Sequence, residues 1–229
     1  MKKGKLIVID GTDGTGKGTQ TELLKKRLKE LDYKVFVADF PRYGKKSAGM
    51  VEEYLNGNLG TSKEVGAYRA SILYATDRYA ASFEIKERIE QGYIVLSNRY
   101  VSANMGHQAG KIKDLKERDK YLEWLEDLEF NIFGIPKPDL NILLFASPEI
   151  NQKLVDEKDA GSREYINGKK RDIHEADKQH LQDAFDSFLY VADKYDWVKI
   201  DCLNKEQQMR SRESINKDIF RIIKPVLDK

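Results

Sequence analysis

Short apolar runs alternate with longer amphipathic stretches along this chain. The runs predicted to be strands lie at residues 6–9, 35–38, 93–96, 140–145 and 197–200. Continuous β-branched runs of this kind are typical of strands buried on both faces of a parallel sheet. Apolar residues at helical spacing occupy the segments between them, at 23–31, 63–90, 114–129, 178–194 and 214–226. This alternation predicts an α/β fold with about five parallel strands between helix layers.

One segment, residues 156–172, does not fit the alternation. It is polar, carries Gly161 and Gly168, and lacks apolar periodicity. In an α/β enzyme such a segment is often a lid over the active site, although an ordinary surface loop has the same composition. We therefore expect residues 1–229 to form a single domain with a short lid at 156–172.

Composition and charge narrow the range of partners. The 229 residues include 40 Lys or Arg and 38 Asp or Glu, which gives a net charge of +2. The chain therefore lacks the large excess of positive charge that would indicate nucleic-acid binding. The single cysteine, Cys202, fits a reducing compartment, and the apolar run near the N-terminus is too short for a signal peptide or a membrane span. We expect a cytoplasmic protein that binds neither nucleic acid nor a membrane.

A glycine-rich turn joins the first predicted strand to the first predicted helix. Gly11, Gly16 and Lys17 fit the first part of the phosphate-binding pattern G-x-x-x-x-G-K. Glycines let backbone N–H groups converge on phosphate oxygens, the helix N-terminus adds partial positive charge, and the lysine reaches the outer phosphates. We predict a three-layer P-loop NTPase fold in which ATP binds Gly11, Asp13, Gly14, Thr15, Gly16, Lys17, Gly18 and Thr19. A glycine-rich hairpin beside a surface lysine is the alternative.

Further segments resemble the thymidylate kinase family. The Gly-Lys-Gly-Thr-Gln variant at 16–20 is similar to nucleoside monophosphate kinases, and the segments 40–43, 73–78, 98–100 and 136–140 follow in the order of thymidylate kinases. Residues 164–168 add a weaker match. The resemblance implies phosphoryl transfer from ATP to dTMP, giving ADP and dTDP for dTTP synthesis, with Mg²⁺ as cofactor and a homodimer as the default assembly.

The resemblance also implies roles for individual residues toward dTMP. Asp13 would bond the deoxyribose 3′-hydroxyl, Arg42 would hold the acceptor phosphate, and Tyr74 would stack on thymine. Arg78, one helical turn after Tyr74, would read a base carbonyl. The remaining residues implied to bind dTMP are Arg99 as a phosphate clamp, Gln108 in the base-pocket segment, and Tyr165 against a ribose 2′-hydroxyl. His107, next to Gln108, is interpreted as a structural or surface histidine.

Positive charge is needed to stabilise the phosphoryl group during its transfer. Residues 12–15, inside the P-loop, contain no arginine, so this charge is expected to come from other residues. Lys17, Arg99 and the lid arginines Arg163 and Arg171 are the predicted catalytic cations. Gly18 stands where the P-loop pattern has a hydroxyl for Mg²⁺.

Asn98 stands where the family normally has an acid. We therefore predict that Asp10 supplies the missing carboxylate and holds Mg²⁺ through water.

Two alternatives stay open at this point. The first is a kinase that acts on another deoxynucleotide or on a deoxynucleoside, which Asn98 leaves possible. The second is a nucleotide-binding regulator without catalysis. The acceptor-side matches argue against the second, because a protein that only senses ATP needs none of them.

Overall fold

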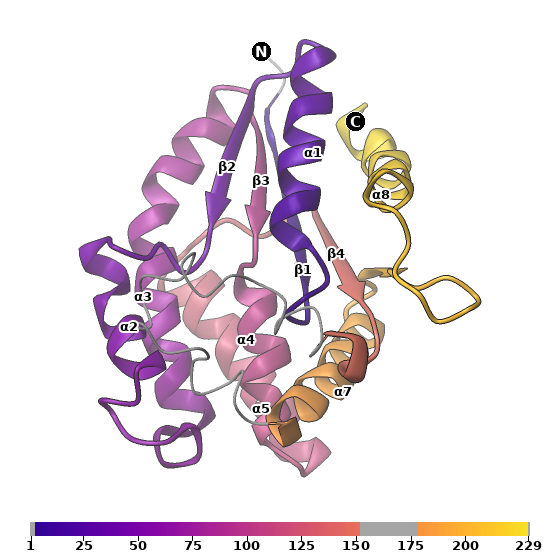
Figure 1. Cartoon of the computed structure of the whole chain (residues 1–229). Coiled ribbons are helices and arrows are strands. Elements are labelled where there is room, and N and C mark those ends of the chain that lie inside the picture. Colours follow the sequence, from indigo (N-terminus) through magenta and orange to yellow (C-terminus); the bar gives the residue numbers. More distant parts are fainter. Residues whose placement is uncertain (1–2, 152–177, 229) are drawn as a thin grey trace.

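The computed structural model describes residues 3–151 and 178–228 (Figure 1). Within these residues, five strands form one sheet in the order β2-β3-β1-β4-β5, and every neighbouring pair is parallel. The strands are β1 (Lys5–Gly11), β2 (Val35–Asp39), β3 (Ile94–Asn98), β4 (Leu140–Phe145) and β5 (Val198–Asp201). The α/β architecture and the positions of the strands predicted from the apolar runs are confirmed.

Helices connect the strands and cover the sheet. They are α1 (Lys17–Glu30), α2 (Gly49–Leu55), α3 (Ser62–Glu90), α4 (Val101–His107), α5 (Leu115–Glu126), α7 (Lys178–Lys194) and α8 (Arg212–Leu227). Short 3₁₀ turns lie at Lys46–Ala48 and Ala109–Lys111, and a π-helical turn at Asp127–Ile132 extends α5. Thr61 and Glu64 form a reciprocal capping box at the first turn of α3. The helix is kinked at Gly66, where φ is +72°, and the long remainder of α3 follows this kink.

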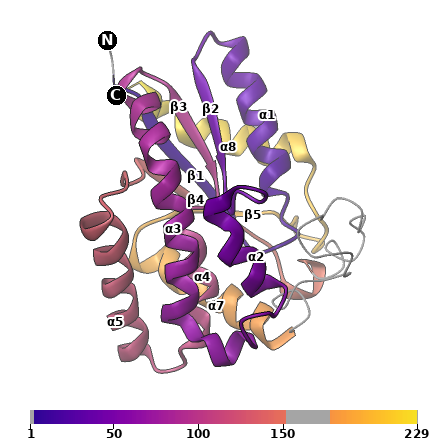
Figure 2. The same ribbon diagram turned by 90° about the vertical axis from the view of Figure 1, so that its left-hand side faces the viewer.

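The side chains of β1 divide the core into two layers. Leu6 and Val8 pack with buried residues of α3, α4, α5 and α7, whereas Ile7 and Ile9 pack with those of α1 and α8. This division follows from the two-residue period of a strand, which points successive side chains to opposite faces. Figures 1 and 2 show α1 and α8 on one face of the sheet and the other long helices on the opposite face.

The carboxyl ends of the strands form the edge where a ligand is expected. β1 leads into α1 on one face, and β3 leads into α4 on the opposite face. In open α/β sheets, strands whose helices leave on opposite faces enclose a crevice that binds ligands. The register places Asn98 beside Ile9 on one side and beside Asp39 on the other.

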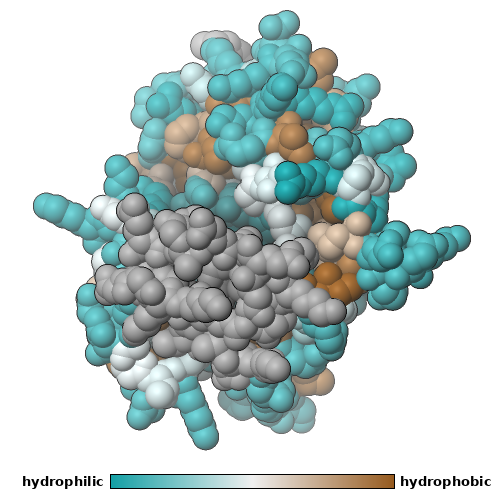
Figure 3. Space-filling view, viewed as in Figure 1, coloured by the Kyte–Doolittle hydropathy of each residue, from teal (hydrophilic) through white to brown (hydrophobic). Residues whose placement is uncertain are grey.

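The surface seen in the orientation of Figure 1 is largely hydrophilic, with smaller apolar patches between the charged side chains (Figure 3). Within the described residues, no helix is long and apolar enough to cross a membrane. The segment 156–172, which the sequence predicts to be a lid, falls in residues 152–177 and lies outside the described part of the chain.

Candidate active site

At two positions of the P-loop, neighbouring backbone passes so close that only glycine fits. A Cβ atom on Gly11 would lie 1.9 Å from the carbonyl oxygen of Leu144 in β4, and φ at Gly11 is +149°. A Cβ on Gly14 would lie 2.7 Å from the carbonyl oxygen of Asn151, with φ at +91°. Both positions therefore exclude a side chain, and they hold the loop between β1 and α1 against its neighbours.

Lys17 is folded back over the P-loop. Its Nζ donates to the carbonyl oxygens of Gly11 and Thr12, each at 3.0 Å, and lies 3.4 Å from Oδ1 of Asp13. The side chain is only 7% exposed, so these oxygens hold the ammonium inside the loop. The phosphate oxygens of a nucleotide would replace carbonyl oxygens around this charge, which is the arrangement expected of a P-loop lysine.

The first turn of α1 presents backbone N–H groups to the same place. Gly16 caps the helix in the left-handed conformation, no side chain caps its N–H groups, and no acid lies in the first turn. Thr15 is buried and its hydroxyl donates to the Thr12 carbonyl at 2.8 Å, whereas Gly18 and Thr19 are exposed. An uncapped helix N-terminus next to a lysine binds anions.

Arg99 reaches from the end of β3 to the P-loop. Its Nη2 pairs with Oδ1 of Asp13, and its backbone adopts a φ of +62°, a strained conformation for a residue with a side chain. The Arg99 N–H donates to the Ile9 carbonyl at 3.1 Å, and the Ser97 hydroxyl donates to the Arg99 carbonyl at 2.6 Å. These bonds hold the strained turn, so the guanidinium faces the crevice.

Asp10 is buried behind the P-loop rather than facing it. Its Oδ1 accepts from the Gly11 N–H at 2.8 Å and its Oδ2 from the Ser102 hydroxyl at 2.6 Å. Burial raises its pKa above the ordinary value, although the charges of Arg99 and Lys17 oppose the rise. Both oxygens are therefore used to fix the loop and α4, and Asp10 is 1% exposed. The role of Asp10 in holding Mg²⁺ through water stays a prediction, while the structure gives its carboxylate a role in fixing the P-loop.

Arg42 is anchored by an acid of α3. Its Nε donates to Oδ1 of Asp77 at 2.9 Å, its N–H donates to Oδ2 at 2.8 Å, and its Nη2 donates to the Ser47 hydroxyl at 2.8 Å. Asp77 is 1% exposed, whereas the Arg42 side chain is 25% exposed. Asp77 thus holds the arginine rigidly while part of the guanidinium stays accessible.

Tyr74 of α3 is half-buried. Its ring meets that of Tyr54 from α2 edge to face, with centroids 6.3 Å apart. Tyr74 and Tyr43 both interact electrostatically with Arg99. The structure therefore brings the predicted stacking residue close to the predicted phosphate clamp.

Arg78 occupies the core instead of a pocket wall. Its Nε donates to both carboxylate oxygens of Glu129 at 3.0 Å, its Nη2 pairs with Oε1, and its Nη1 donates to the Tyr100 carbonyl at 3.3 Å. Arg78 is 1% exposed and Glu129 is fully buried. A buried acid from another segment therefore holds the Arg78 guanidinium, and the role of Arg78 toward a base stays a prediction.

The end of α4 contributes buried polar groups beside the P-loop. Gln108 is 1% exposed, and its Oε1 has no hydrogen-bond partner in the described part of the chain. His107 packs edge to face on Phe188 and stacks on His180. Burial, and then the charge of Arg99, hold the pKa of His107 well below its ordinary value, so the ring is neutral at pH 7. The interpretation of His107 as structural agrees with this packing.

Comparison with known proteins identifies the family. The sequence profile described as thymidylate kinase matches residues 9–212. The thymidylate kinase of Mycobacterium tuberculosis is 33% identical over 179 residues, which cover 77% of this chain and 80% of that protein. The chain belongs to the thymidylate kinase family. A probable thymidylate kinase from Pyrobaculum aerophilum is 31% identical over 69% of this chain and 73% of that protein.

The fold of a solved family member agrees with this assignment. The structure of thymidylate kinase from Candida albicans superposes with a TM-score of 0.70 at 20% sequence identity. The match covers 97% of this chain and 92% of that one. At this identity the likeness concerns the fold, and it confirms the P-loop architecture predicted from the Gly11–Lys17 turn.

Three residues with roles implied by the family resemblance lie outside the described residues. They are Arg163, Tyr165 and Arg171, which all fall in 152–177. Their roles stay predictions from the sequence.

The structure adds site residues that the sequence analysis did not single out. Asn151 donates to the Thr12 hydroxyl at 2.7 Å, and Asp77, Ser102 and Glu129 hold Arg42, Asp10 and Arg78 as described above. Asp77 lies within the segment 73–78 but was given no role there, and the other three lie outside the family motifs that the sequence analysis used. The available signal was indirect, because buried acids such as Asp77 and Glu129 need a cationic partner.

The oxygen groups at the sheet edge fit a magnesium ion carried mainly by phosphates. Among residues 3–151 and 178–228, no group of three or more His, Cys, Asp or Glu side chains is placed to hold a metal ion by itself. Mg²⁺ usually keeps several waters and binds one or two carboxylates plus substrate phosphates. Asp13 and Asp39 provide carboxylates here, and Oδ1 of Asn98 is buried without a partner in the described residues.

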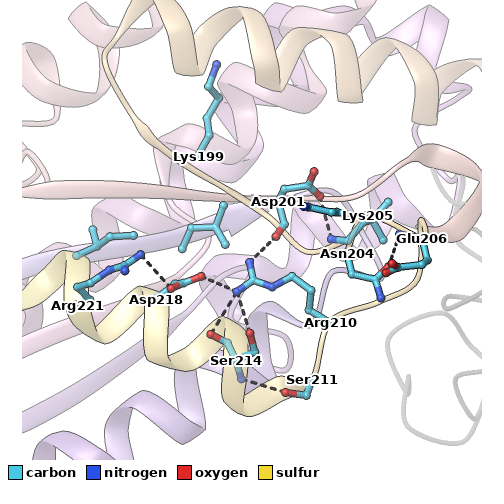
Figure 4. Close-up of a pocket in the computed structure, with 13 residues that line it drawn as sticks. Lys199, Asp201, Asn204, Lys205, Glu206, Arg210, Ser211, Ser214, Asp218 and Arg221 are labelled. Carbon is cyan, nitrogen blue, oxygen red and sulfur yellow. Dashed lines mark hydrogen bonds and ion pairs between the residues drawn. The ribbon is translucent and has the colours of Figure 1, made fainter.

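A second pocket lies away from the P-loop, between the end of β5, the loop that follows it and the start of α8 (Figure 4). Arg210 crosses this pocket. It donates to the Asp201 carbonyl at 2.9 Å and to the Ser214 hydroxyl at 2.9 Å, and it pairs with Asp218 at 2.5 Å. These bonds stabilise the loop between β5 and α8, and no P-loop residue lines this pocket.

Proposed function

We propose that this chain transfers the γ-phosphoryl group of ATP to dTMP, giving ADP and dTDP. The observation that carries the proposal is the Lys17–Asp13–Arg99 cluster at the crevice between β1 and β3, in a chain that belongs to the thymidylate kinase family. A phosphate-binding lysine and a guanidinium fork meet there across one carboxylate. A protein that only bound ATP would need no second phosphate clamp.

The donor side of the reaction is assigned to the P-loop. The uncapped N–H groups of α1 and the Lys17 ammonium would bind the β- and γ-phosphates of ATP. Phosphoryl transfer requires alignment of donor and acceptor and positive charge on the transferring oxygens rather than covalent chemistry. The lid arginines Arg163 and Arg171 are proposed to add that charge when the nucleotides are bound.

The acceptor side is assigned to the crevice next to Arg99. Arg99 and the Asp77-anchored Arg42 would bind the phosphate of dTMP, because a planar guanidinium matches phosphate oxygens bidentately. Asp13 would accept from the deoxyribose 3′-hydroxyl, and Tyr74 would stack on the thymine ring. Gln108 offers a buried acceptor without a partner in the described residues for a polar group of the base.

Magnesium is proposed as the cofactor of the reaction. When bound with ATP, it would neutralise phosphate charge at the transferring group. Asn98, at the end of β3, lies at the sheet edge where such an ion would be held through water.

We also propose that two copies of the chain associate through α3. Four large apolar side chains on this helix are exposed at 41% to 61%: Tyr68, Ile72, Tyr79 and Phe83. Their spacing of four, seven and four residues places them on one face of α3, the helix that lies toward the viewer in Figure 2. An exposed apolar stripe of this kind typically marks a protein interface.

The association is tested by the mass of the protein in solution. Phe83→Glu should convert a dimer to a monomer in light scattering, whereas Leu31→Glu, an exposed apolar position on the far side of the sheet, should not. A wild-type monomer at micromolar concentration would contradict the proposed dimer.

A cytoplasmic location is proposed from the cysteine chemistry. Cys202 is the only cysteine and is fully buried. Burial, and then the charge of Asp201, raise its pKa to about 11, so it stays a thiol at neutral pH. Fractionation of the native cells tests the location.

The reaction is tested by identifying its products. Purified protein incubated with ATP, Mg²⁺ and dTMP should give equal amounts of ADP and dTDP by chromatography. ADP formation without dTDP would show hydrolysis instead of transfer. No nucleotide turnover by correctly folded protein would refute the proposed function.

A further inference from the structure

Two oxygen groups that usually hold magnesium beside a P-loop are missing from this chain. P-loop enzymes hold the ion through a Ser or Thr hydroxyl directly after the lysine and through an Asp at the end of a nearby strand. Gly18 stands after Lys17, and β3, which pairs with β1, ends in Asn98. Neither residue brings a negative charge or a hydroxyl to the site.

The structure places an acid next to both vacant positions. Asp39 ends β2 and lies beside Asn98 in the sheet register. Asn98 Nδ2 donates to Asp39 Oδ1 at 2.7 Å, while the Asp39 side chain is exposed at the sheet edge. A Cβ on Gly18 would lie 3.9 Å from Asn98 Nδ2, so the first turn of α1 faces this pair.

The charges of Lys17 and Arg99 lie within electrostatic range of this pair. Partial burial raises the pKa of Asp39 above its ordinary value, and the hydrogen bond from Asn98 and then the charges of Arg99 and Lys17 oppose the rise. Oδ1 of Asn98 is buried and has no hydrogen-bond partner among the described residues, which is unusual for an amide oxygen. Mg²⁺ keeps several waters and binds one or two carboxylates plus substrate phosphates, so an exposed carboxylate at this edge of the sheet can hold its water shell.

We propose that Asp39, oriented by Asn98, is the acid of this active site and binds the water shell of the magnesium that accompanies ATP. The inference rests on the proposed function, since it assigns a positioning residue to that reaction. Asp10 does not fill this role, because both of its oxygens are used within the fold. Asp13 already pairs with Lys17 and Arg99.

Three variants separate this role from a purely structural one. Asp39→Asn removes the charge and keeps the size of the side chain. Glu22→Gln is the matched control, because Glu22 lies on the exposed side of α1, within electrostatic range of Asp39, and pairs with Lys25. The double variant Asp39→Asn with Asn98→Asp exchanges the two groups and returns one carboxylate to the same edge.

The direct readout is metal binding, independent of turnover. Mn²⁺ affinity of the protein–ADP complex is measured by electron paramagnetic resonance, and ADP affinity is measured by calorimetry with and without Mg²⁺. Groups that act on a metal through an intervening ligand typically change its affinity by 10- to 100-fold. Asp39→Asn should therefore weaken Mn²⁺ binding about 10-fold, raise the Mg²⁺ concentration for half-maximal rate, and leave metal-free ADP binding unchanged.

The control and the exchanged pair complete the test. Glu22→Gln should bind Mn²⁺ like the wild type, and the exchanged pair should recover most of the lost affinity. Unchanged Mn²⁺ affinity in Asp39→Asn would overturn the proposal, as would a loss equally large in Glu22→Gln. If Asp39→Asn does not fold, failure of the folded exchanged pair to bind Mn²⁺ as the wild type does would overturn it. Failure of the wild type to phosphorylate dTMP would refute the proposed function but not the metal-binding result.

Discussion

Replacing Glu129 by alanine should be among the most destabilising single changes in this chain. The change leaves the Arg78 guanidinium in the core without its counter-ion, and the two side chains are 2% and 0% exposed. Burial alone would lower the pKa of Arg78, but the Glu129 carboxylate raises it above its ordinary value, so the guanidinium is charged in the fold. Removing one partner of a buried ion pair typically costs about 3–5 kcal/mol. For a chain of this length, that loss lowers Tm by about 6–20 °C.

The assay is thermal unfolding beside a matched surface pair. Arg88 and Glu84 also lie on α3 and pair at 3.3 Å, but their side chains are 32% and 51% exposed. Glu84→Ala should therefore cost less than about 1 kcal/mol. Equal losses of Tm in Glu129→Ala and Glu84→Ala would refute the reasoning.

The same pair decides whether Arg78 has a role toward the base. Replacing both residues, as Arg78→Met with Glu129→Leu, should recover much of the stability, because apolar side chains of similar size fill the site without a buried charge. The ratio of kcat/KM for dTMP to that for dCMP should then stay as in the wild type. A collapse of the ratio in the folded double variant would support the base-reading role that the family resemblance implies.

Three further changes test other parts of the account. Lys17→Ala should lower kcat by about 100-fold or more with the fold intact, because its charge acts on the transferring phosphates; near-normal kcat would contradict the P-loop assignment. Arg163→Ala or Arg171→Ala should lower kcat far more than dTMP affinity, as expected for a contact made in the transition state; wild-type kcat in both would exclude the lid arginines. Lys111 donates to the Tyr54 hydroxyl at 2.8 Å, and burial lowers its pKa to about 7. Between pH 7 and pH 10.5, Lys111 is protonated in the unfolded chain but largely neutral in the fold, so a falling pH favours the unfolded state. The contribution of Lys111 to the free energy of unfolding is therefore complete above pH 10.5 and is lost as the pH falls to about 7. Lys111→Met should flatten that slope in pH-dependent unfolding.

The sequence predicted the sheet and the longer helices because their apolar runs are long enough to show a period. The segment 140–145 coincides with β4, and 178–194 coincides with α7. The helices α2 and α4 were not predicted, since each spans seven residues, about two turns, which is too short for a helical period to be read. Tertiary packing determines these two helices: α2 packs on α3, and α4 packs on the sheet.

The site was predictable where a local motif creates it and not where distant segments meet. The Gly11–Lys17 turn and Arg99 lie next to strand ends, so their place followed from the strands. The burial of Arg78 against Glu129 could not be predicted, because the spacing of Arg78 from Tyr74 gives the helix face but not the depth, and Glu129 lies 51 residues away. Asp10 was chosen over Asp39 because it adjoins the P-loop in sequence, whereas Asp39 meets Asn98 only through the register of β2 and β3.

The central claim is that the crevice beside Arg99 accepts dTMP and the P-loop donates the phosphoryl group. The most direct measurement is kcat/KM in an ADP-release assay with ATP and a panel of acceptors: dTMP, dUMP, dCMP, dAMP, dGMP and thymidine. The account predicts the highest value for dTMP, an intermediate value for dUMP, and little turnover of dCMP or thymidine. A higher value for another monophosphate or for thymidine, or ADP release that does not depend on any acceptor, would contradict the account.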